Sequence, residues 1–158
     1  MIGMNMIIEG LALGAFNNMY KQTEEPLLKS ITFNVMRDES RHVAFGVISL
    51  KGYYADMSEG ERRDREDFVL EACELMRDRL VGEDIAREFG WKEAEVREVV
   101  LASPLMQQFR QLLFMRVVPN IKRLGLLTPR VRQGFSDLQI IQFEDADPEA
   151  MDRQLGLA

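Results

Sequence analysis

Residues 37–46 have the sequence RDESRHVAFG, in which Glu39 and His42 stand three positions apart. The surrounding segment, from about 25 to 56, has few Gly or Pro residues and no alternating pattern, which predicts one long helix. Positions i and i+3 of a helix share a face, so this carboxylate and this imidazole could bind one metal ion. The inner stripe predicted for the helix consists of Leu28, Thr32, Val35, Met36, Glu39, His42, Val43 and Gly46. An uncompensated charge on such a stripe is unfavourable, and a cation bound by Glu39 would remove that penalty.

Glu9 is the second candidate ligand, and it is the only acidic residue among the first 23. Residues 2–20 predict a helix that precedes the helix of Glu39. If the two helices form an antiparallel hairpin turning near Thr23, Glu9 lies 14 residues before the turn and Glu39 lies 16 after it. At about 1.5 Å of rise per residue, the two carboxylates differ in level by about 3 Å, less than one helical turn. We therefore expect Glu9, Glu39 and His42 to converge.

The three side chains together form a recognisable half of a larger metal site. A carboxylate from one helix and an E-x-x-H pair from its neighbour make up half of the di-iron carboxylate site of four-helix bundles. Oxygen and imidazole donors suit iron, with manganese as the alternative. Asp38 is a candidate partner for the other ring nitrogen of His42, although it could instead pair with Arg41.

The segment Arg37–Gly46, preceded by Glu9-Gly10, resembles the second half of ferritin-like di-iron proteins. The ribonucleotide reductase small subunit and related di-iron oxygenases carry a similar Arg-Asp-Glu-x-x-His segment, with a glutamate about thirty residues earlier. The resemblance covers about residues 1–57, and it implies that Glu9, Glu39 and His42 are metal ligands and that Asp38 supports them. The p-aminobenzoate N-oxygenase group is also similar, but it has a histidine where this chain has Val35.

A complete site of this kind needs a second Glu and a second E-x-x-H, and the chain has only one His. The acid pairs Glu71/Glu74 and Glu95/Glu98 have the right spacing but no His. Either the chain is the C-terminal half of a bundle whose first helix pair is missing, or two copies form a homodimer with one half-site each. We favour the first explanation, because Met1 stands almost inside the first site helix.

The rest of the chain predicts accessory helices. We expect a ferritin-like helical domain over 1–135, with the metal-site helix pair at 1–57 and accessory helices at 58–135, followed by an acidic, partly disordered tail at 136–158. Ser58 to Glu61 form a capping-box pattern that starts a helix, and Trp91 is expected to anchor a short one. Residues 99–136 contain no acid but several Arg and Lys residues, which we expect to pair with acidic helices at 58–98 rather than with a partner.

Composition limits the remaining possibilities. The net charge of −6 disfavours nucleic acid as a partner. Cys73 is the only cysteine, so an internal disulfide is impossible, and we expect it to be a buried structural thiol. No stretch is apolar enough to span a membrane, so we expect a soluble, cytoplasmic protein.

The sequence thus predicts an all-α, ferritin-like helical bundle, present as its second helix pair with additional C-terminal helices. The predicted function is an O₂-activating di-iron oxidoreductase, either a monooxygenase or a protein like the ribonucleotide reductase small subunit. An unknown small-molecule substrate and an electron-donor protein would be its partners. Two alternatives stay open: a ferritin-type iron-binding protein with ferroxidase activity, and a truncated, metal-free helical interaction module.

Overall fold

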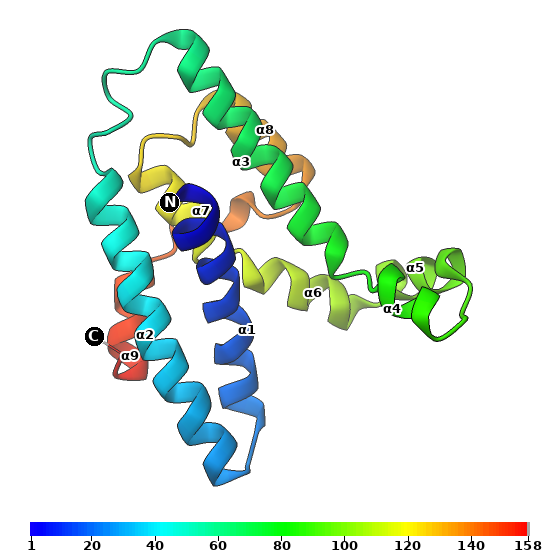
Figure 1. The fold of residues 1–158 in the computed structure, drawn as a ribbon. Coiled ribbons are helices and arrows are strands. Elements are labelled where there is room, and N and C mark those ends of the chain that lie inside the picture. The colour runs from blue at the N-terminus through cyan, green and yellow to red at the C-terminus, as the bar shows by residue number, and fades with distance from the viewer. Residues whose placement is uncertain (158) are drawn as a thin grey trace.

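The structure is a computed structural model that describes residues 1–157, and Figure 1 shows that these residues fold into packed helices. The predicted all-α class is therefore confirmed. None of the described helices is long and apolar enough to cross a membrane. In chain order the elements are η1 (Ile2–Ile8), α1 (Glu9–Gln22), α2 (Pro26–Leu50), α3 (Glu59–Arg79), α4 (Glu83–Glu88), α5 (Glu93–Ala102), α6 (Pro104–Leu113), α7 (Val117–Arg123), α8 (Pro129–Asp137), η2 (Ile141–Phe143) and α9 (Pro148–Leu155).

Helices α1 and α2 form the predicted antiparallel hairpin (Figure 1). Thr23 has extended backbone angles and ends α1, and Pro26 occupies the first turn of α2, where its missing N–H is not needed. The Glu25 carboxylate caps α2 by accepting hydrogen bonds from the backbone N–H groups of Leu27 and Leu28. Helix α2 ends at Leu50, six residues earlier than expected, because Lys51 leaves the helix with extended angles.

The core is built around α7, in which Val117, Val118, Pro119, Asn120 and Ile121 are all buried. The π-helical segment η1 lies against α2, α3 and α7. Helix α1 packs closely on α6, and Gly14 makes this possible: a Cβ atom there would lie 2.9 Å from the Cα atom of Leu113. The two N-terminal elements are therefore fixed from several sides, which matters because Glu9 lies at their junction.

Helices α3 and α8 pack side by side on another flank of the molecule (Figure 1). Helix α3 starts with the predicted capping box between Ser58 and Glu61. Cys73 on α3 is buried, as predicted, and burial raises the pKa of its thiol to about 12. Helices α4 and α5 pack on each other away from the main core, and Trp91 is 58% exposed there and stacks on Phe89. The expectation that Trp91 is an anchor was wrong, because no described element covers this pair on its outer side.

The acidic segment after Ser136 forms η2 and α9, so the expected partial disorder was wrong. Its acids neutralise most of the basic run that precedes them, and Leu157 is buried in the core. Arg130 alone pairs with the acidic helix α3, through Glu66 and Asp67. The acidic segment forms the ion pairs Arg116–Asp152, Lys122–Asp145, Arg123–Asp147, Arg123–Glu149 and Arg132–Glu144. The prediction that the basic residues pair mainly with residues 58–98 was therefore wrong for most of them.

Candidate metal centre

The junction of η1 and α1 positions Glu9. Residues Ile2–Ile8 form a π-helix, a conformation that is rare and frequently found at functional sites, and Glu9 is the first α-helical residue after it. Met6 and Ile7 are buried and fix η1 against the core. Gly46 lets η1 approach α2, because a Cβ atom there would lie only 2.7 Å from the Cβ atom of Asn5.

The structure brings Glu9, Glu39 and His42 together, as the helical rise predicted. One ligand atom from each residue lies within 4.8 Å of the others. The Nδ1 atom of His42 is 3.4 Å from Oε2 of Glu39 and 3.8 Å from Oε1 of Glu9. Two donors bound to one ion at about 2.0–2.2 Å each are separated by about 3–4 Å, so the spacing suits a shared cation.

Asn5 holds this arrangement in place, and the sequence analysis did not identify it. Its Nδ2 group donates to Oε2 of Glu9 at 3.0 Å and to the backbone carbonyl of His42 at 3.3 Å. The amide thereby links the two site helices and leaves Oε1 of Glu9 directed at the imidazole. The available signal was that Asn5 and Glu9 are the only strongly polar residues among the first 16.

The site is more open than expected. The side chain of His42 is 59% exposed, against 16% for Glu9 and 25% for Glu39. The predicted inner stripe of α2 was wrong at Leu28 and His42, which are exposed. The buried residues of α2 are Thr32, Met36, Ser40, Val43, Gly46 and Leu50. The physical reason is that α9 also contacts α2: Ser40 hydrogen-bonds Asp152, which extends the buried arc of α2 away from His42.

Asp38 is not part of this cluster. Its carboxylate is 62% exposed and pairs with Arg41 at 3.2 Å. The ring nitrogen of His42 that faces protein groups is already directed at Glu9 and Glu39. Of the four predicted site residues, the structure therefore brings three together and leaves Asp38 outside.

The donor set fits a divalent transition metal. Within residues 1–157, no Lys or Arg nitrogen lies within 4.0 Å of the Glu9 or Glu39 carboxylate, so His42 is the only basic side chain beside these two acids. Two carboxylates and one imidazole are ligands that iron and manganese accept. The exposed side of the site leaves coordination positions for water or another ligand.

The chain was compared with family models, with characterised proteins and with solved structures. None of the three comparisons gave a match.

Proposed function

We propose that Glu9, Glu39 and His42 bind iron, with manganese as the alternative, and that the protein acts as an O₂-activating oxidoreductase. The observation that supports this most is the convergence of three metal-ligating atoms within 4.8 Å, without a Lys or Arg partner in the described chain. Iron bound there would supply the one-electron and O₂ chemistry that side chains alone do not perform.

Each residue has a distinct part in this proposal. Glu39 and His42 come from one turn of α2 and fix the distance between a carboxylate and an imidazole ligand. Glu9 comes from α1 and closes the site from the second helix. Asn5 orients Glu9 by binding the carboxylate oxygen that faces away from His42. The solvent-facing side gives O₂ and a substrate access to the ion.

The two elements η1 and α2 also carry exposed apolar side chains. Met4, Ile8, Ile31 and Phe45 are each about half exposed or more. Exposed apolar side chains that gather in a patch mark interaction surfaces. We propose that a second copy of the chain, the second of the two explanations drawn from the sequence, covers this surface, because the chain has one His and a complete two-metal centre needs a second half-site. The assembled centre would then hold two ions between two half-sites.

Anaerobic equilibrium dialysis against Fe²⁺ tests the metal proposal. We expect about one ion per chain, as half of a two-metal centre requires. Glu9→Gln, Glu39→Gln and His42→Gln should each remove most of the bound iron. Asp38→Asn is the matched control, because it removes an exposed acid next to Glu39 without touching the cluster. Equal iron contents in all four variants would contradict the ligand assignment, and negligible iron in the wild type would favour the metal-free interaction module.

Exposure of the iron-loaded protein to O₂ tests the oxidoreductase proposal. We expect O₂ consumption well above that of Fe²⁺ in buffer, lost in His42→Gln and kept in Asp38→Asn. Steady oxidation of many Fe²⁺ ions per chain, together with large oligomers, would instead support the ferritin-type alternative.

Light scattering with and without Mn²⁺ tests the second copy. We expect the metal to shift the chain from monomer to dimer, and Phe45→Glu to block the shift without removing the metal. A monomer that holds stoichiometric metal would overturn the dimer but leave the ligand assignment standing.

A further inference from the structure

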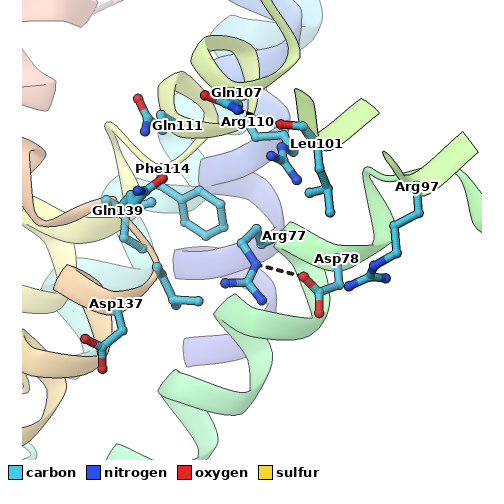
Figure 2. A pocket seen from close by; sticks show the side chains of 12 residues that line it. Arg77, Asp78, Arg97, Leu101, Gln107, Arg110, Gln111, Phe114, Asp137 and Gln139 are labelled. Carbon is cyan, nitrogen blue, oxygen red and sulfur yellow. Dashed lines mark hydrogen bonds and ion pairs between the residues drawn. The ribbon is translucent and has the colours of Figure 1, made fainter. Parts of the chain in front are cut away.

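A second charged site lies where α3, α5, α6 and the segment after α8 meet. The cavity there has a volume of about 280 Å³. Figure 2 shows the side chains of Arg77, Arg97 and Arg110 in its lining, together with Gln107, Gln111 and Gln139. These residues come from four separate stretches of the chain, so only the folded protein assembles the site.

Two of the three arginines of the cavity have acidic partners. Arg77 Nε donates to Asp78 at 2.7 Å and its guanidinium also lies 3.7 Å from Glu74, and Arg97 donates to Glu83 at 2.8 Å. A guanidinium carries five N–H donors, so both side chains keep donors for another partner. The other acid in the lining, Asp137, accepts from Gln133, and Figure 2 shows its carboxylate directed away from the guanidinium groups.

Arg110 forms no ion pair. No carboxylate oxygen in residues 1–157 lies within 4.0 Å of its guanidinium, and its Nε atom is buried without a hydrogen-bond partner. Burial lowers the pKa of Arg110, and the charge of Arg77 lowers it further; the charge of Asp78 opposes this shift, and Arg97 adds to it. A buried donor without a partner is unfavourable, so an acceptor that entered the cavity and bonded to the Arg110 guanidinium would remove an energetic penalty.

Gln139 provides an independent observation. It has a φ of 60°, the left-handed conformation that favours glycine, and it is the only non-glycine residue described with a positive φ. It ends α8 in a Schellman arrangement, in which the N–H of Gln139 donates to Ser136 and that of Ile140 donates to Phe135. Glycine would be more stable at this position but would remove the amide side chain from the cavity. The helix end accounts for the left-handed conformation, and the residue that adopts it places a glutamine side chain in the lining of the cavity.

We propose that this cavity binds a phosphate group, as inorganic phosphate or as a phosphate monoester. Several guanidinium groups with free donors match the several oxygens of a phosphate, and arginine binds such groups in a bidentate manner. The glutamine amides can donate to the remaining oxygens. The cavity is at the small end for ligand sites, so it suits a small anion or the phosphate end of a larger molecule. The proposal is independent of the metal centre.

Isothermal titration of the metal-free protein with inorganic phosphate and with phenyl phosphate tests this proposal. We expect saturable binding of at least one of the two probes, weakened by about tenfold or more in Arg110→Gln, because the uncompensated cation is lost. The matched control is Arg87→Gln, which removes the same charge from an exposed residue that pairs with Glu93 outside the cavity. Tighter binding of phenyl phosphate would identify a monoester as the ligand, and equal binding would identify the free anion.

Gln139→Gly separates a binding role from a structural one. We expect this variant to melt at a higher temperature than the wild type and to bind phosphate more weakly, two changes of opposite sign. Phosphate binding that is absent, or equal in the wild type, Arg110→Gln and Gln139→Gly, would overturn the proposal.

Discussion

The candidate metal centre and the arginine cavity each contain charged side chains that lack an ordinary ion-pair partner, whereas a third cluster is a complete ion pair. Glu9 and Glu39 have no Lys or Arg partner, and Arg110 has no carboxylate within 4.0 Å. Arg116 and Asp152, in contrast, pair with each other, and their side chains are only 3% and 15% exposed. Two side chains of opposite charge that pair with each other can be buried. The Glu9/Glu39/His42 cluster and the arginine cavity are open to solvent, and a ligand of opposite charge can bind the groups there that lack such a partner.

The largest expected effect is on the free energy of unfolding, when the buried Arg116–Asp152 ion pair is disrupted. Asp152→Ala leaves Arg116 buried without a counter-charge and also removes the acceptor of the Ser40 hydroxyl. Losing one partner of a buried ion pair costs about 3–5 kcal/mol of the free energy of unfolding, which urea denaturation measures. Glu149→Ala serves as the control, because it removes a largely exposed partner of Arg123 and should have a much smaller effect. Similar losses in both variants would show that Asp152 is not an internal anchor.

A second prediction concerns the unbalanced acids. Glu39→Gln should change the stability of the metal-free protein little, because the only ion-pair partner of Glu39 is the largely exposed His42 and the change also removes the repulsion between Glu9 and Glu39. With Mn²⁺ at a hundredfold excess over its Kd, the wild type should gain about 2.7 kcal/mol of unfolding free energy, and the variant should gain almost nothing. Thermal denaturation with and without metal measures both values. An equal metal-dependent gain in the two proteins would place the bound ion elsewhere.

Asn5 should have a smaller effect, because it orients a ligand without binding the ion. Asn5→Ala should weaken Mn²⁺ binding by about tenfold, the low end of the range for residues that support metal ligands. Competition with a chelating dye measures the affinity. Asn34→Ala is the control, because the Asn34 amide only donates to the Ser30 carbonyl on the exposed side of α2. If the two variants lose affinity equally, Asn5 has no positioning role.

The part of the site that depends on helical geometry alone could be predicted from the sequence. The levels of Glu9 and Glu39 follow from the rise per residue and from the short turn at Thr23. The exposure of His42 could not be predicted in this way, because it depends on which face of α2 packs against the rest of the protein. One contact on the buried face is the hydrogen bond from Ser40 to Asp152 of α9, more than a hundred residues later in the chain.

The arginine cavity likewise could not be predicted from the sequence. The sequence indicates a basic run at 99–136, but which of its members lacks an acid depends on where the acids of α3 and of residues 144–152 come to lie. Arg130 forms an ion pair with α3, Arg116 forms one with α9, and Arg110 forms none with either. The left-handed conformation of Gln139 could not be predicted either, since nothing in the residue type of a glutamine indicates a positive φ.

Electron spin-echo spectroscopy of the untagged, Mn²⁺-loaded protein tests the ligand assignment most directly. The chain has a single histidine, so an imidazole nitrogen coupled to the Mn²⁺ spin can come only from His42. We predict a clear ¹⁴N modulation in the wild type and its loss in His42→Gln. Stoichiometric Mn²⁺ binding without that nitrogen signal would contradict the metal centre described for α1 and α2.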